Sequence, residues 1–587
     1  MEKRWDYQKE LDPCRIQQLA KASGLSETVV RLLAVRDLTT ESDIDLFLHP
    51  EKAKYHEPFL LKDMEKAVDR ITEALVNRES IQIWGDYDVD GITSTGLLYL
   101  FFVKWLGIKA DYVIPNREFD GYGLSKAGIK EAAEKGINLI ITVDCGITSV
   151  NEVEYAKELG VDIIITDHHE PDKELPKAVA IIDPKREDCP YPFKHLAGVG
   201  VAFKLIQGIL FKNEMSMSIT SDFLDIVTIG TAADIVPLTG ENRKIVSEGL
   251  KYLENCKNVG ISVLLKKLNF YRKSIKVSNI LFGIAPRLNA VGRMGDAVRA
   301  VKLLLSNDPE EAEGIVEELE VENRRRREFD SETLKEAIRL VEGGGETFDP
   351  DRDKAIVVAN ENWHVGVIGI VASRLVERYY RPSVVISVSD GIGKGSCRSI
   401  PGVNIYDVLI ECYKINLLEK ENFGGHSYAA GFEIDSSKIP EFRAKFNEIL
   451  ISRIPKRDFE QSLKIDLKIE LKDIDSHLIE NLKMFEPFGP ANEQPIFSSD
   501  NVQVEGDIRI VGNRSDHSGK KLKTRDNHLK MKLRQGGVVF DAIGFNLAGK
   551  YDLISGVDHG LNIAYSIEEN HWNGKLYVQL KIVDIVL

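Results

Sequence analysis

The 587-residue sequence has few cysteines, no long apolar run and no low-complexity segment. Its six cysteines are scattered without a C-x-x-C pair, which argues against a disulfide framework or a structural zinc site and favours reduced thiols. No apolar run reaches the roughly 20 residues of a membrane span, and the start, MEKRWDYQKELDP, lacks the apolar stretch of a secretory signal. These absences predict a cytoplasmic protein that makes no membrane contact.

The composition is that of a folded protein, with 43% hydrophobic and 29% charged residues. A chain of this length exceeds one hydrophobic core, so three or four domains are expected. The formal net charge of −15 does not exclude a nucleic-acid partner, because binding depends on local patches.

Short β-branched runs alternate with amphipathic stretches between about residues 80 and 183. The runs are SIQIW, ADYVI, NLIITV, DIIIT and AVAIID. This alternation predicts βαβ units and a buried parallel sheet, and ligands gather at the carboxyl ends of such strands. Residues 310–342 are typical of one long charged helix, a second αβ pattern runs from about 355 to 454, and β-type alternation beyond 459 predicts a small barrel or sandwich.

Acidic side chains and histidines follow three of the predicted strands. Asp86, Asp88 and Asp90 alternate after SIQIW, so they can converge on a cation, whereas an EF-hand would need a glutamate where leucines stand. NLIITV ends at Asp144, and DIIIT ends in the run Asp167, His168 and His169. A lone aspartate after a strand is more often a helix N-cap, but three coincident strand ends favour a metal site.

Carboxylates with imidazole suit Mn²⁺, Fe²⁺ or Zn²⁺ better than Mg²⁺. So many carboxylates indicate two ions with a shared ligand, an arrangement that supports in-line displacement at phosphorus. Asp225 and Asp234 interrupt an apolar helical pattern, and a buried acid needs a partner, so Asp234 is the favoured additional ligand.

The motifs GDYDVDG, TVDCG, TDHH and GTAADIVPL resemble, in order and spacing, the four motifs of the DHH phosphoesterase superfamily. Later segments resemble its RecJ branch, the single-strand-specific 5′→3′ DNA exonucleases. These segments are IAPRLNAVGRM, NENWHVGVIGIVASRL, GSCRS, FGGHSYAAGF and FEPFGPANEQPIF. The resemblance covers nearly the whole chain.

The resemblance implies two Mn²⁺ ions, with Mg²⁺ as the alternative. One site would be built by Asp90, Asp144, His168 and Asp234, and the other by Asp88 and the bridging Asp144, with Asp86 helping. His169 would contact the scissile phosphate or a proton in transfer, and its alternative role is to orient a ligand histidine. Asp88, Asp90, Asp144 and His169 are thus the expected catalytic residues.

The implied fold is α/β with a parallel-sheet DHH catalytic domain, a long linking helix, a second α/β domain of the DHHA1 type and an OB-like C-terminal β-barrel. The corresponding boundaries are residues 1–50 for an N-terminal segment without a clear pattern, 51–307, 308–345, 346–456 and 457–587.

Residues outside the metal motifs are the candidate substrate contacts, although each could be an ordinary surface or turn residue. The second-domain members, from His364 on, would grip a 5′ phosphate. The candidates are Asn116, Arg117, Arg287, Asn289, Arg293, His364, Ser396, Arg398, Gly424, Gly425 and His426. Residues 508–535 contain nine Lys or Arg but only two acidic residues, a basic excess that is expected of a strand-binding barrel.

The expected activity is metal-dependent 5′→3′ hydrolysis of single-stranded DNA to mononucleotides in repair and recombination. The expected partners are single-stranded DNA with a 5′ phosphate, a helicase and a single-strand-binding protein, and the chain is expected to be a monomer. Two alternatives are a DHH phosphodiesterase of short oligoribonucleotides or nucleotide phosphates, and an inactive strand-binding replication factor. The basic β-region disfavours the first, and the complete ligand set disfavours the second.

Overall fold

The computed structural model describes residues 3–9, 11–116, 123–344, 348–350, 352–419, 423–453, 460–512, 527–556, 560–572 and 575–587. The chain divides into two compact units. The first combines Met1–Lys54, Pro237–Thr239 and Gln461–Leu587, and the second combines Tyr55–Val236 and Gly240–Glu460. Among the helices of the described ranges, none is long and apolar enough to cross a membrane.

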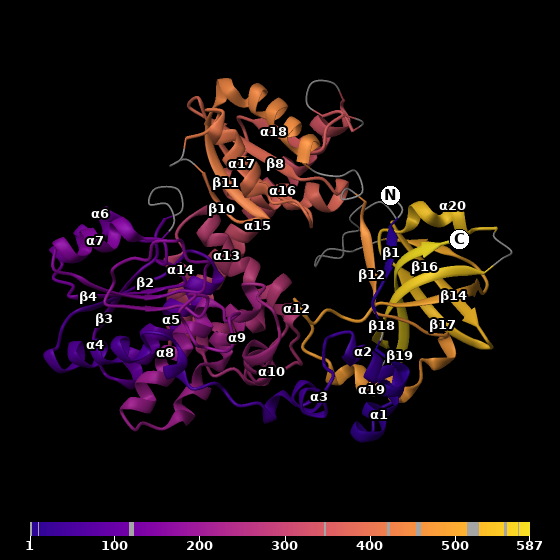
Figure 1. The fold of residues 1–587 in the computed structure, drawn as a ribbon, viewed down its shortest axis with the longest axis horizontal. Coiled ribbons are helices and arrows are strands. Elements are labelled where there is room, and N and C mark those ends of the chain that lie inside the picture. The colour runs from indigo at the N-terminus through magenta and orange to yellow at the C-terminus, as the bar shows by residue number, and fades with distance from the viewer. Residues whose placement is uncertain are drawn as a thin grey trace. The chain divides into compact units, whose positions relative to one another are not determined.

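A parallel five-stranded sheet forms the N-terminal part of the second unit, with strand order β3-β2-β4-β5-β6. Its central strands are rich in isoleucine and almost fully buried, because helices α6 and α7 cover one face and α4 and α8 the other (Figure 1). The elements are α4 (Met64–Asn77), β2 (Ile81–Trp84), α5 (Val89–Leu100), β3 (Ala110–Val113), α6 (Lys126–Glu134), β4 (Leu139–Val143), α7 (Val150–Glu158), β5 (Asp162–Thr166), β6 (Ala180–Ile182) and α8 (Gly198–Lys212).

A helical region follows and ends in the predicted long helix, α15 (Pro309–Glu342). Asp308 caps α15 by accepting a hydrogen bond from the Glu310 amide at 2.9 Å, and Pro309 occupies the first helical position. The preceding helices are α9 (Leu224–Ala233), α10 (Gly240–Glu254), α11 (Val259–Lys267), α12 (Val277–Asn279), α13 (Ala285–Met294) and α14 (Val298–Leu305).

The second α/β region has a five-stranded sheet in the order β10-β11-β9-β8-β7, in which β7 and β8 are parallel and the other pairs antiparallel. Separate apolar cores lie on its two faces. The elements are β7 (Ile356–Asn360), α16 (Val365–Tyr379), β8 (Ser383–Ser389), β9 (Ile392–Arg398), α17 (Ile405–Lys414), β10 (Phe423–Gly425), β11 (Ala429–Asp435) and α18 (Ile439–Arg453).

The first unit contains a closed barrel, which confirms the predicted C-terminal β-fold. Strands β14, β16, β17, β19 and β18 pair in that cyclic order, with β17 and β19 parallel. This is the connectivity of an OB-type barrel. The elements are β12 (Ser462–Ile465), β13 (Leu467–Lys468), α19 (Ser476–Met484), β14 (Phe497–Val504), β15 (Arg509–Val511), β16 (His528–Gln535), β17 (Val538–Gly544), α20 (Tyr551–Ile554), β18 (Leu561–Trp572) and β19 (Lys575–Val586).

The N-terminal residues, for which the sequence shows no clear pattern, belong to the barrel's unit. Strand β1 (Arg4–Tyr7) pairs in parallel with β12 (Figure 1). The three N-terminal helices share one apolar core with α19 and the barrel. Their bounds are α1 (Pro13–Ser23), α2 (Glu27–Ala34) and α3 (Glu41–Leu48).

Candidate metal centre and nucleic-acid interface

The carboxyl ends of β2, β4 and β5 bring the predicted acidic and imidazole side chains to one edge of the parallel sheet. Asp86 follows β2, Asp144 follows β4, and the run from Asp167 to His169 follows β5. Asp86, Asp144 and His168 are buried. Asp144 adopts a left-handed backbone with φ 61°, which sharply turns the chain directly after the strand.

Asp88 and Asp90 are held by the first turns of two different helices. Asp88 caps α5, and its Oδ1 accepts hydrogen bonds from the Asp90 and Gly91 amides at 2.9 and 3.2 Å. The carboxylate of Asp90 accepts from the Gly198 and Val199 amides at the start of α8, at 2.6 and 2.8 Å. The helix N-terminus therefore offers both of its first amides to the Asp90 charge.

His168 lies at the centre of the acidic cluster. Its Nε2 is 3.1 Å from Oδ1 of Asp144, 3.6 Å from Oδ2 of Asp234 and 3.8 Å from Oδ2 of Asp90. Asp234 comes from the end of α9, where it occupies the C-cap. Four segments separated in sequence thus meet around one imidazole nitrogen.

Three groups of potential ligand atoms lie within 4.8 Å of one another. Two are Asp86 with Asp88 and Asp144, and Asp90 with His168 and Asp234. The third adds His169 to Asp144 and His168. The structure therefore brings together every residue that the sequence analysis placed at the metal sites.

The protonation of this cluster follows from burial and from repulsion between like charges. Burial, followed by the charge of Asp88, raises the pKa of Asp90 to about 7. Burial and the neighbouring carboxylates also raise the pKa values of Asp144 and Asp234. Burial, together with the charge of His169, lowers the pKa of His168 to about 3, so its imidazole is neutral. Crowded carboxylates beside a neutral imidazole form a donor set that a divalent cation would stabilise.

His169 has the opposite protonation to its neighbour. Its Nδ1 lies 2.6 Å from Oδ1 of Asp167, which also accepts hydrogen bonds from the backbone amides of His168 and His169. Although burial acts to lower the pKa of His169, the hydrogen bond and charge of Asp167 raise it to about 9. The contact with Asp167 thus favours the protonated form of His169. Asp167 binds and orients this imidazole.

Two residues near this edge were missed by the sequence analysis. Asp183 follows β6, is fully buried, and has a pKa raised to about 7 by burial and then by the charge of Asp167. The charge of Lys185 acts to lower the pKa values of His168 and Asp234. The Nζ atom of Lys185 lies 3.4 Å from Oε1 of Glu170. The run AVAIID ends in Asp183, so the strand-end rule used for the other acids could have identified it.

Helix α13 holds three of the expected substrate contacts, and each has protein partners. Arg287 donates to Oε1 of Glu320 at 2.5 Å and to the Gly283 carbonyl at 2.8 Å. Asn289 accepts from the Val89 amide at 3.2 Å, beside the metal loop. Arg293 lies 3.5 Å from the Gly366 carbonyl. Asn289 therefore supports the start of α5, a role that the sequence analysis did not foresee.

The second α/β region places its expected contacts on α16, β9 and β10. His364 caps α16 by accepting from the Gly366 amide at 2.9 Å. Arg398 donates to Oγ of Ser396 at 3.0 Å. A Cβ added to Gly369 of α16 would lie 2.9 Å from Arg398 Nη2 and 3.1 Å from Ser396 Oγ, so the helix passes closely over this pair.

The β10–β11 hairpin exposes the last three candidates of the second α/β region, Gly424, Gly425 and His426. Gly424 and Gly425 end β10, and His426 follows them. Burial lowers the pKa of His426, and the charges of His169 and Lys185 lower it further, so His426 lies within electrostatic range of the catalytic edge. Asn116 is half-buried, and Arg117 lies outside the described residues.

The barrel of the first unit has a basic outer face on β16. Lys530, Lys532 and Arg534 alternate on its exposed side, and Arg534 also pairs with Glu505. Phe545, directly after β17, is 46% exposed. Strands 2 and 3 of an OB barrel are its usual oligonucleotide face, and β16 and β17 occupy those positions. The other lysines and arginines of the basic stretch, from 514 to 525, lie outside the described residues.

The fold and the cluster define a DHH-family protein with two further domains. A model of the DHH family, N-terminal domain, matches residues 80–231, the DHHA1 domain matches 352–452, and the RecJ OB domain matches 465–584. The first two matches fall in the second unit and the third falls in the first unit.

Comparison with curated relatives and solved structures assigns the chain to one branch of the DHH family. The chain is 39% identical to the single-stranded-DNA-specific exonuclease RecJ of Bacillus subtilis (strain 168), over 99% of this chain and 70% of that protein. Crystal structures of RecJ from Thermus thermophilus in complex with Mn²⁺ and with Mg²⁺ match with TM-scores of 0.82 and 0.76 at 28% and 26% identity. They cover 100% and 99% of this chain, and 79% and 78% of the RecJ chain. The chain belongs to the RecJ family of single-stranded-DNA-specific exonucleases.

Proposed function

We propose that this protein hydrolyses single-stranded DNA from its 5′ end and releases mononucleotides. The principal observation is the convergence of five aspartates and His168 at one sheet edge, in groups whose ligand atoms lie within 4.8 Å. The RecJ membership of the chain supports single-stranded DNA as the substrate. Mononucleotide release and the 5′→3′ direction are part of the proposal.

The residues fit two divalent cations. Among the described residues, the buried Oδ2 of Asp234 has no hydrogen-bond partner, and Nε2 of His168 lies 3.6 Å from it. We assign Asp90, Asp144, His168 and Asp234 to one cation, and Asp88 and Asp144, assisted by Asp86, to the other. Mn²⁺ suits the mixed oxygen and nitrogen donors, and Mg²⁺ is the alternative. When bound, such cations lower the pKa of water and stabilise negative charge at phosphorus.

Two side chains of the protein, His169 and Asp144, contribute to the hydrolysis beside the cations. His169, kept protonated by Asp167, donates a hydrogen bond to a non-bridging phosphate oxygen and stabilises the charge that develops there. Asp144, turned by its left-handed backbone, is the proposed shared ligand, because it groups with Asp86 and Asp88 and its Oδ1 lies 3.1 Å from Nε2 of His168. The burial of the cluster keeps bulk water away, which strengthens these interactions.

We further propose that the second α/β region grips the 5′ end of the strand. Ser396, Arg398 and the exposed His426 beside Gly424 and Gly425 combine a hydroxyl, a guanidinium and an imidazole, which together suit a terminal phosphate. Arg117, Arg287, Asn289, Arg293, His364 and Asn116 complete the proposed contacts. The basic β16 face of the first unit is a further proposed contact for single-stranded DNA.

In the cell, a monomeric cytoplasmic enzyme of this kind would act in repair and recombination. A helicase would supply the single strand, and a single-strand-binding protein would be the second partner. These partners follow from the substrate, because a single-strand-specific enzyme depends on prior unwinding of duplex DNA.

The test is digestion of 5′-labelled and 3′-labelled single-stranded and duplex DNA with Mn²⁺, Mg²⁺ or chelator. Wild type should release labelled mononucleotide from the 5′ end of single strands only, and only with metal. Asp144→Ala should abolish release, whereas the exposed Asp172→Ala should not. Release from the 3′ end, or cleavage restricted to short oligoribonucleotides, would contradict the proposal, as would binding without cleavage.

A further inference from the structure

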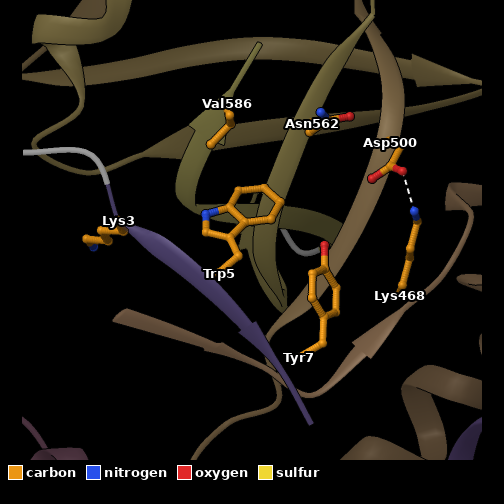
Figure 2. A pocket seen from close by; sticks show the side chains of 7 residues that line it. All are labelled: Lys3, Trp5, Tyr7, Lys468, Asp500, Asn562 and Val586. Atoms are coloured by element: carbon orange, nitrogen blue, oxygen red, sulfur yellow. Dashed lines mark hydrogen bonds and ion pairs between the residues drawn. The ribbon is translucent and has the colours of Figure 1, made fainter. Parts of the chain in front are cut away.

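A cavity of about 560 Å³ opens in the first unit, beside the N-terminal strand β1 (Figure 2). No residue that lines it belongs to the candidate metal centre or to the expected substrate contacts. Its lining consists of Lys3, Trp5, Tyr7, Lys468, Asp500, Asn562 and Val586. The volume is within the range of small-ligand pockets, roughly 300 to 1,000 Å³.

One wall of the cavity is built by alternate residues of β1 and the residue before it. Because side chains alternate along a strand, Lys3, Trp5 and Tyr7 share a side, and Figure 2 shows both rings directed toward the barrel strands. Trp5 Nε1 donates to Oδ2 of Asp584 at 2.8 Å, and Ser498 Oγ donates to the Tyr7 hydroxyl at 3.3 Å. These hydrogen bonds fix the polar ends of both rings, and 51% of Tyr7 remains exposed.

The opposite wall is polar. Asn562 offers an amide that both donates and accepts, and Asp500 forms an ion pair with Lys468 across the cavity edge (Figure 2). Val586 is the only aliphatic residue among the lining residues. An apolar peptide side chain would need more aliphatic surface than this, whereas two rings, an amide, a carboxylate and two ammonium groups match the parts of a nucleotide.

The cavity is separate from the usual ligand face of the barrel. Its barrel residues come from β14, β18 and β19, which are strands 1, 4 and 5 in the OB order, whereas oligonucleotides usually bind to strands 2 and 3. The basic face of β16 therefore does not include it.

We propose that this cavity binds one nucleotide. The base stacks on Trp5 and Tyr7, Asn562 and Asp500 bond its edge, and Lys468, at the Asp500 end of the cavity, faces its phosphate (Figure 2). The nucleotide is either a free mononucleotide or one unit of a single strand, since both present the same chemistry. This binding goes beyond the proposed hydrolysis and needs no metal.

The test uses the full chain in chelator, which suppresses hydrolysis. The chain is photolabelled with 8-azido-dAMP, the labelled peptides are mapped by mass spectrometry, and dAMP affinity is measured by equilibrium dialysis. We expect label on the peptide that contains Trp5 and Tyr7. Tyr7→Leu and Lys468→Gln should each weaken dAMP binding, Tyr7→Leu by about tenfold or more.

Two matched variants are the controls. Tyr577→Leu removes a tyrosine that is 45% exposed on β19, and Lys472→Gln removes a lysine whose ion pair with Glu470 resembles that of Lys468. Neither residue lines the cavity, and both variants should bind dAMP as the wild type does. Thermal unfolding confirms that each variant is folded.

Competition with unlabelled dAMP or with an oligonucleotide distinguishes a mononucleotide site from a site for one unit of a strand. Loss of label with free dAMP supports a mononucleotide site, and loss only with an oligonucleotide supports a strand site. The proposal is overturned if β1, β14 and β18 take no label, if neither competitor protects them, or if Tyr7→Leu and Lys468→Gln bind like the controls. Exonuclease assays of Tyr7→Leu in Mn²⁺ report on catalysis separately, so failure of one proposal does not imply failure of the other.

Discussion

His168 and His169 are adjacent, yet their surroundings give them opposite protonation. We predict that His169→Ala lowers kcat by about 10²- to 10³-fold, the range typical of a hydrogen-bond donor that stabilises charge in the transition state. The affinity for Mn²⁺, measured by calorimetry, should stay near the wild-type value. Asp167→Asn should reduce kcat as well, because Asp167 orients His169. A large loss of Mn²⁺ affinity in His169→Ala would instead make His169 a ligand, as its grouping with Asp144 and His168 allows.

Asp183 provides a prediction about pH. Its pKa in the folded chain is raised to about 7, above the ordinary value of about 3.9. Its contribution to stability is therefore fully present below about pH 4 and is lost as the pH rises through 7. In chelator, the stability advantage of Asp183→Asn over wild type should grow as the pH rises from about 4 to 7 and then level off, as measured by urea unfolding.

The control for Asp183 is Asp172→Asn, at an exposed position a few residues after β5. This variant should follow the wild-type pH dependence. If Asp183→Asn is less stable than wild type at pH 8, the carboxylate is ionised and paired in the folded chain, and the burial argument is wrong.

The acids of the metal edge could be predicted from the sequence because strand periodicity and parallel topology together fix where each strand ends. The hydrogen-bond partners of these acids could not be predicted from the sequence. Asp90 bonds to amides 108 and 109 residues away, and Asn289 bonds to an amide 200 residues away. Such contacts depend on how helices pack, and no local pattern in the sequence records that packing.

At the scale of elements, the close approach of α8 to Asp144 provides the next prediction. A Cβ at Gly198 would lie 2.7 Å from both Cβ and Oδ1 of Asp144. Gly198→Ala should therefore displace Asp144 or the first turn of α8, and reduce both Mn²⁺ affinity and exonuclease rate by at least about tenfold. Circular dichroism should show an intact fold.

The matched change is Gly314→Ala in α15, where an added Cβ meets no atom within 4 Å. It should leave the rate unchanged and stabilise the helix by about 0.5 to 1 kcal/mol. Equal rates for Gly198→Ala and wild type would show that the start of α8 can shift without cost to the site.

Elements with strong periodicity, such as α15 and the isoleucine-rich strands, were predictable because their patterns are local. The N-terminal helices were not assigned to any domain. Their apolar residues pack against α19 and the barrel, more than 400 residues later in the chain. A local reading of the sequence has no means of finding that partner.

At the scale of the whole molecule, this shared core implies that the barrel depends on the N-terminus. Leu33 is fully buried in the common core. Leu33→Ala should lower the free energy of unfolding of the first unit by about 2 to 5 kcal/mol. Leu46→Ala on α3, where the side chain is 41% exposed, is the control and should change it by less than about 0.5 kcal/mol. Hydrogen exchange of the β16 and β17 amides reports on the barrel, and unchanged exchange in Leu33→Ala would refute the dependence.

The first unit is assembled from residues at both ends of the chain, and this has a consequence during translation. After Lys54 has left the ribosome, about 400 residues must follow before Gln461 emerges. At roughly 5 to 20 residues per second, the apolar faces of α1, α2 and α3 wait about 20 to 80 seconds for their partners. Over that interval the nascent N-terminus is a natural client for a chaperone, while the second unit is completed first.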